Sequence, residues 1–139
     1  MLVVDSSSIA SLYFPEKYSK FVENYITSSE GDKILTLDLA FYELANVIRK
    51  RIIRGEIKRD DGKRIFKSML NLMSTFEIHH YNDIIGDTLD LALENNITIY
   101  DASFLQLAIK YNAKLLTTDL KLITSTISKF TNHLVKLNT

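Results

Sequence analysis

Two short apolar runs, each leading to an aspartate, constrain the fold of this chain more than any other feature. Residues 2–4 lead directly into Asp5, and residues 113–117 are followed closely by Asp119. Runs of this length and composition are typical of buried strands. When buried strands alternate with helices, the sheet is parallel and ligands bind beyond the carboxyl ends of its strands. We therefore expect Asp5 and Asp119 to face one crevice.

Two further acids are expected to join them. Asp101 opens an amphipathic segment that Asn112 ends, and Glu43 lies in the first turns of a helix that follows Asp38. A carboxylate with apolar neighbours is costly unless something cationic meets it. An alternative is that Asp5 only caps the helix that follows it. Because three serines (residues 6–8) can supply that cap, we do not expect the acid to be needed for it.

The alternation of segments predicts an α/β fold with a mostly parallel sheet of short strands, covered by helices on both faces. Strands are expected near residues 2–5, 33–36, 114–117 and 133–137, with a further extended piece at 76–80. Pro15 is expected in the first turn of a helix. Without repeats or linkers, the 139 residues are expected to form one domain, 1–139.

Composition limits the class of protein. Forty-six per cent of the residues are hydrophobic, enough for a core, and the chain has no cysteine, which excludes disulfides and thiolate metal sites. The first residues lack the pattern of a signal peptide, and no apolar run approaches the roughly 20 residues of a membrane span. We therefore expect a soluble, cytoplasmic protein without a membrane partner.

The formal net charge is zero, but one segment is strongly basic. Residues 49–67 contain nine basic and three acidic side chains, so this segment carries +6 and the remainder −6. A block of this kind is either a phosphate-binding face or a solvated helical hairpin. If the segment faces the acids, Arg49, Lys50 and Arg54 are the candidates for contacting RNA.

Clustered acids repel one another and their pKa values rise unless a cation is present. His79, His80 and His133 have no partner at metal-ligand spacing, so an ion would be held by oxygen ligands alone. Such ligands favour Mg²⁺ or Mn²⁺ over zinc. The chemistry most consistent with that site is metal-assisted hydrolysis of a phosphodiester bond.

The acids occur in four short motifs that resemble those of the PIN-domain nucleases, in the same order and at similar separations. The motifs are Leu-Val-Val-Asp-Ser-Ser at 2–7, Tyr-Glu-Leu-Ala-Asn-Val at 42–47, Tyr-Asp-Ala at 100–102 and Leu-Leu-Thr-Thr-Asp at 115–119. The size and layout are most similar to VapC-type toxins. The resemblance implies a three-layer α/β/α PIN-like domain.

The resemblance also implies a function and partners. It implies a ribonuclease dependent on Mg²⁺ or Mn²⁺, with Asp5, Glu43, Asp101 and Asp119 as catalytic and metal-binding acids. By the same matching, Ser7 and Thr117 support those acids with their hydroxyls. A homodimer, inhibited by a small VapB-like antitoxin, is implied as well. The aromatic and methionine side chains at helical spacing in residues 15–31 and 65–73 are the expected interface with either partner.

Two other functions stay open from the residues alone. A non-catalytic PIN-like module would bind RNA or a protein without hydrolysis. A phospho-acceptor domain, similar to a response-regulator receiver, would need an acceptor aspartate on a middle strand and a lysine ending a late strand. Neither feature of a receiver is clear, and the pair Asp101 and Asp119 would have no role there.

Overall fold

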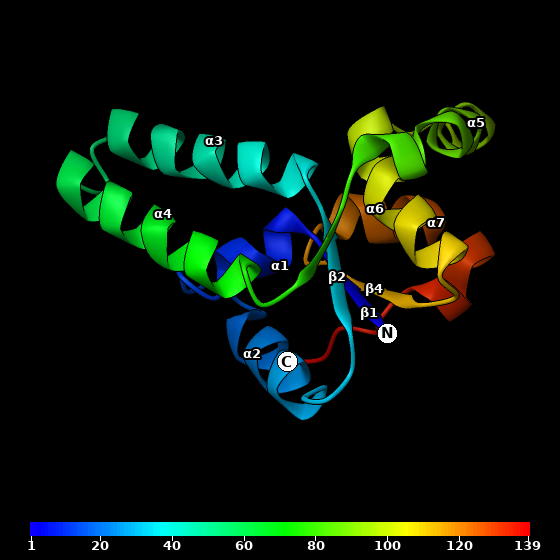
Figure 1. Cartoon of the computed structure of the whole chain (residues 1–139), viewed down its shortest axis with the longest axis horizontal. Helices are drawn as coiled ribbons and strands as arrows, with labels where there is room; N and C mark the ends of the chain where they lie inside the picture. The colour runs from blue at the N-terminus through cyan, green and yellow to red at the C-terminus, as the bar shows by residue number, and fades with distance from the viewer.

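The computed structural model describes residues 1–139 as alternating short strands and helices (Figure 1). In chain order the elements are β1 (Leu2–Val4), α1 (Ser6–Ser11), α2 (Ser19–Ser28), β2 (Ile34–Leu37), α3 (Leu39–Ile53), α4 (Arg59–Met73), β3 (Glu77–His79), the 3-10 turn η1 (Tyr81–Asp83), α5 (Ile85–Asn95), α6 (Ile99–Lys110), β4 (Lys114–Leu116), α7 (Leu120–Phe130) and the 3-10 turn η2 (Thr131–His133). None of these helices is both long and apolar enough to cross a membrane.

The four strands form one parallel sheet in the order β3-β2-β1-β4. The first strand of the chain therefore lies between β2 and β4, with Val3 opposite Leu35 on one side and Leu115 on the other. Because every strand runs the same way, the residues that follow them emerge along one edge. This topology brings the start of the chain next to residue 116, as predicted.

Helices cover both faces of the sheet. In Figure 1, α1–α4 lie on one side of the strands and α5–α7 on the other, and the α3–α4 pair extends away from the sheet as a hairpin. Val3 and Val4 of the central strand β1 and Leu115 of β4 have no accessible surface, which is the burial on both faces expected of a parallel sheet. The fold is the three-layer α/β/α arrangement expected from the sequence.

Helix α6 shows why the sequence folds in this way locally. Thr98 caps its first turn by accepting a hydrogen bond from the Asp101 amide at 3.1 Å. Ala102, Leu105 and Ala108 are fully buried against the strands, at the spacing of one helical face. Past its end, Asn112 adopts the left-handed conformation, with φ of 50°, and turns the chain into β4. The helix thus presents Asp101 at the same edge as the strand ends.

Two local predictions were wrong. Pro15 lies before α2, which begins only at Ser19, so the proline is not in a helical turn. The strand expected at 133–137 is not formed. In its place, η2 is followed by a single parallel bridge between Leu134 and Leu115, with the Val135 amide bonded to the Leu115 carbonyl at 3.0 Å. The backbone there follows β4 for too few residues to make a ladder.

The expected interface stripes are mostly covered within the chain. Met69 and Met73 of α4 and Val22 of α2 are fully buried. The large exposed apolar side chains lie elsewhere: on α5 they are Ile85, Leu89 and Leu93, and beside them are Tyr42, Tyr81 and Tyr100. The α5 residues recur at every fourth position, which places them on one helical face without a partner in the chain.

Candidate acidic site

Asp5 follows β1 and is 5% exposed. Its Oδ1 accepts a hydrogen bond from the Ser8 amide at 3.0 Å and another from the Ser7 hydroxyl at 2.7 Å. Asp5 is therefore the cap of α1, although the sequence suggested that the serines would take that role. Burial raises its pKa, a shift that hydrogen bonds from Thr117, Ser8 and Ser7 oppose and the charge of Asp119 reinforces.

Ser7 and Thr117 join the ends of β1 and β4. Ser7 Oγ lies 3.2 Å from Thr117 Oγ1 and accepts a hydrogen bond from the Thr118 amide at 3.0 Å. Thr117 Oγ1 in turn accepts from the Asp119 amide at 3.1 Å. These bonds connect residues more than 100 positions apart in the chain and hold Asp5 and Asp119 in one network. Both hydroxyls therefore lie beside the acids, Ser7 bonded to Asp5 and Thr117 bonded to the Asp119 amide.

Glu43 reaches the same region from the first turns of α3. Its Oε1 accepts a hydrogen bond from Ser6 Oγ at 3.0 Å. Burial raises its pKa to about 7, partly offset by the Ser6 bond and further supported by the charges of Asp5, Asp101 and Asp119. Ser6 was not predicted as a site residue, because a run of three serines does not indicate which hydroxyl faces the acid.

Asp101 and Asp119 complete the group. Burial raises the pKa of Asp101, and the charge of Asp119 adds to the shift, while Thr98 and Lys121 oppose it. Asp119 caps α7, accepting from the Lys121 and Leu122 amides at 3.1 and 3.2 Å. Three helix starts, those of α1, α6 and α7, therefore meet here, and the positive ends of their dipoles favour negative charge.

No lysine, arginine or histidine forms an ion pair with any of these four acids. The acids lie near enough to raise one another's pKa values, yet no three acid or histidine side chains form a ready-made metal cage. Oxygen donors without histidine or cysteine suit a hard divalent ion, and Mg²⁺ usually takes only one or two carboxylates and keeps several waters. The donor set therefore fits such an ion.

A polar groove of about 260 Å³ adjoins the acids. It is lined by Ser6, Ser7, Glu43, Asn46, Val47 and Lys50. Of the three basic residues predicted to contact RNA, only Lys50 lines this groove. Arg49 lines a different groove with Ile52, Ile53 and Arg59, and Arg54 is the residue that ends α3.

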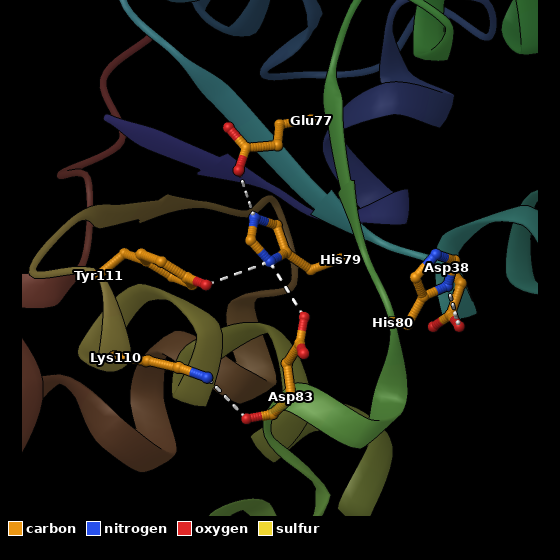
Figure 2. Close-up of polar contacts among 7 residues, drawn as sticks. All are labelled: Asp38, Glu77, His79, His80, Asp83, Lys110 and Tyr111. Atoms are coloured by element: carbon orange, nitrogen blue, oxygen red, sulfur yellow. Dashed lines mark hydrogen bonds and ion pairs between the residues drawn. The ribbon is translucent and has the colours of Figure 1, made fainter.

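A second polar cluster lies at β3, on the opposite edge of the sheet from β4 (Figure 2). The buried ring of His79 has Nε2 3.1 Å from Glu77 Oε1, and Nδ1 3.4 Å from both Asp83 Oδ2 and the Tyr111 hydroxyl. Lys110 donates to the Asp83 carbonyl at 2.8 Å. Nearby, His80 Nδ1 lies 3.3 Å from Asp38 Oδ2, so Asp38 pairs with a histidine and makes no side-chain cap for α3.

The chain is similar to known proteins over most of its length. The model of the PIN domain matches residues 2–124. Ribonuclease VapC3 of Pyrobaculum aerophilum is 38% identical over 121 residues, which cover 87% of this chain and 91% of that protein. The region that the PIN-domain model matches contains all four acids.

Solved structures agree on the fold. A crystal structure of a protein from Pyrobaculum aerophilum superposes with a TM-score of 0.69 at 26% identity, covering 90% of this chain and 85% of that one. A chain of a toxin–antitoxin complex from Klebsiella pneumoniae superposes with a TM-score of 0.67 at 16% identity, covering 98% and 97%. At that identity the likeness is one of fold alone. This chain belongs to the PIN-domain family and is similar to the VapC ribonucleases.

Proposed function

We propose that this chain is an endoribonuclease that hydrolyses RNA phosphodiester bonds with Mg²⁺ or Mn²⁺, and that it is the toxin of a toxin–antitoxin pair. The observation that carries the proposal is the set of four acids at one sheet edge with no cation paired to any of them. Uncompensated carboxylates reduce the stability of a fold, so they are kept for a ligand that supplies positive charge. The 38% identity to a ribonuclease supports RNA as the substrate.

Asp5, Glu43, Asp101 and Asp119 would hold the ion through their carboxylate oxygens. When bound, the ion activates a water molecule and neutralises charge that develops on the phosphate. Ser7 and Thr117 orient Asp5 and the loop that carries Asp119 through the bonds described above. With a pKa of about 7, Glu43 holds a proton at its Oε atoms below neutral pH and releases it above, so its carboxylate would be free to hold an ion mainly at higher pH.

The direct test incubates metal-free protein with a linear and a circular RNA, each with and without Mn²⁺, beside the Asp5→Asn variant. The expected result is metal-dependent cutting of both RNAs by the unaltered chain and of neither by the variant. Cutting of the circle identifies attack within the strand, because a circle has no end for an exonuclease. The nuclease proposal fails if neither RNA is cut in Mn²⁺ or Mg²⁺.

A non-catalytic PIN-like module is the second candidate. It is favoured by the observation that no three acid or histidine side chains are placed to coordinate one metal ion. Such a module would bind RNA with steep salt dependence and cut nothing in Mn²⁺. The same incubation, followed by a binding assay, separates the two functions.

We propose a VapB-like antitoxin and a second copy of the chain as protein partners. Likeness to a chain of a toxin–antitoxin complex supports the first. For the second, the α5 residues Ile85, Leu89 and Leu93 offer a face that two copies can bury against each other about a two-fold axis. It adjoins an apolar pocket of about 290 Å³ that includes Tyr42, Tyr81 and Tyr100. Light scattering of Leu89→Lys tests the dimer, which the lysine should dissociate.

A further inference from the structure

The proposed ribonuclease function, on which this inference depends, leaves open how an RNA strand is held beside the acids. We propose that Lys50 and Asn46 form a track on α3 that binds the RNA backbone next to the phosphate being cut. Lys50 provides charge for a neighbouring phosphate, and Asn46 provides a hydrogen-bond donor for a phosphate or a 2′-hydroxyl. Both are positioning residues and neither takes part in the hydrolysis.

The geometry of α3 supports this track. Glu43, Asn46 and Lys50 follow one another at intervals of three and four, so they lie on one face of the helix. All three line the same polar groove, together with Ser6 and Ser7 from the start of α1. At 1.5 Å of rise per residue, Lys50 is about 10 Å along the helix axis from Glu43. A strand lying in the groove would therefore pass the acids first and Lys50 next.

The side chains of the track have no partners within the protein. Lys50 forms no ion pair, and neither Lys50 nor Asn46 makes a side-chain hydrogen bond. Both residues are exposed and available to a ligand.

Other cations of the α3–α4 hairpin differ in this respect. Arg51 pairs with Glu56 at 3.0 Å and stacks on the Phe14 ring at 3.9 Å, and Arg64 pairs with Asp61 at 3.1 Å. Arg51 therefore contacts the turn after α3 and the loop before α2, and Arg64 pairs within α4. Among the unpaired cations at the end of α3, which include Arg49 and Arg54, Lys50 is distinguished by the groove it lines.

Arg49 provides a matched control. It is adjacent in sequence, carries the same charge and is also exposed, but it lines the groove formed with Ile52, Ile53 and Arg59. Binding that depends only on the overall charge of the hairpin would respond equally to the loss of either residue. Binding along the proposed track would respond to Lys50 alone.

The first experiment measures binding without cutting. Full-length protein carrying Asp5→Asn is titrated against a fluorescent unstructured RNA over a range of salt concentrations, alone and with Lys50→Ala, Lys50→Arg, Arg49→Ala or Asn46→Ala. The expected result for Lys50→Ala is weaker binding and a salt slope lower by about 0.7, the value for one phosphate contact of a single strand. Lys50→Arg and Arg49→Ala should keep the slope, whereas Asn46→Ala should weaken binding without changing it.

The second experiment measures cutting in the chain that retains Asp5. Lys50→Ala should raise KM several-fold and leave kcat nearly unchanged, because the contact is made equally in the ground and transition states. Equal salt slopes for Lys50→Ala and Arg49→Ala would overturn the track, as would the absence of any RNA binding. If RNA binds through Lys50 but the unaltered chain cuts nothing, the nuclease proposal fails and the track stands.

Discussion

The acidic site lies at the carboxyl ends of the strands, and the His79 cluster lies on the outer strand β3. Both contain carboxylates, but only in the His79 cluster do these pair with basic side chains. Around His79, each acid has a partner: Glu77 lies near the ring and 3.8 Å from Lys33, and Asp83 lies near the other ring nitrogen. Around Asp5, the partners are hydroxyls, amides and other acids. The first cluster is complete within the chain, whereas the four acids of the second form no ion pair with any basic side chain.

This is the difference expected between acids that stabilise the fold and acids that, under the proposed function, bind a ligand. Paired polar groups at a buried position stabilise a structure when all are satisfied. Carboxylates that raise one another's pKa values repel one another and so reduce the stability of the folded state. Changes at the two clusters should therefore affect different properties, namely stability at His79 and RNA cleavage at Asp5.

The largest expected effect is that of Asp5→Asn. Cleavage of RNA in Mn²⁺ should fall by a factor on the order of 10² or more, because a charged ion ligand is replaced by a neutral one. Stability should be unchanged or higher, since asparagine caps a helix as well as aspartate and removes a buried charge. A fluorescence assay of cutting and a thermal melt measure the two. Cleavage at the rate of the unaltered chain would refute the role of this acid.

Ser7→Ala should have a smaller effect on the same property. The variant loses the 2.7 Å bond to Asp5 and the acceptor of the Thr118 amide. Loss of a group that orients an ion ligand typically costs about 10–100-fold in ion affinity. Titration of Mn²⁺ against cleavage rate measures the shift, and Ser28→Ala, on an exposed helix end, is the control. An unchanged Mn²⁺ requirement would show that Ser7 does not support the ion.

His79→Ala should act on stability alone. The substitution removes a buried ring together with its contacts to Glu77, Asp83 and Tyr111, which typically costs about 0.5–3 kcal/mol. For a chain of this size, that lowers Tm by about 4 °C for each kcal/mol. His80→Ala, which removes an exposed contact with Asp38, should change stability by only about 0.5 kcal/mol or less. A loss of cleavage by folded His79→Ala would contradict the separation of the two clusters.

The smallest expected effect is a dependence of stability on pH in metal-free protein. Because the pKa of Glu43 is raised to about 7 in the fold, the native state retains a proton that the unfolded chain releases near its ordinary pKa of 4.5. Stability should therefore fall as pH rises through this interval, by about 1–2 kcal/mol after solvent screening. Glu43→Gln should flatten the curve, and the exposed Glu94→Gln should not. A curve that rises over the interval would contradict the shift.

The sequence predicted the site better than the details around it. The proximity of Asp5 and Asp119 could be predicted because residues that follow parallel strands emerge along the same end of the sheet, and β1 pairs directly with β4. Glu43 was harder to place, since its position depends on how α3 packs against the sheet. The capping role of Asp5 was not predicted. Capping preferences rank residue types, and they do not show that one aspartate can both cap α1 and belong to the group of acids.

The failures have a common physical cause. Residues 133–137 have a strand-like composition and lie beside the edge strand β4, but the folded backbone follows β4 only as far as a single bridge to Leu115. The stripe on α4 looked like an interface because its methionines are apolar, but the chain itself covers Met69 and Met73. Local patterns reveal which residues avoid water, and only the folded chain reveals which surface covers them.

The strand order has a consequence for synthesis. The middle position of β1 next to β4 means that Asp5, although synthesised long before Asp119, meets it only after β4 has left the ribosome. A nascent chain that ends at β3 carries neither Asp101 nor Asp119. Whatever reaction the assembled group performs therefore cannot begin until β4 and the residues up to Asp119 have been synthesised.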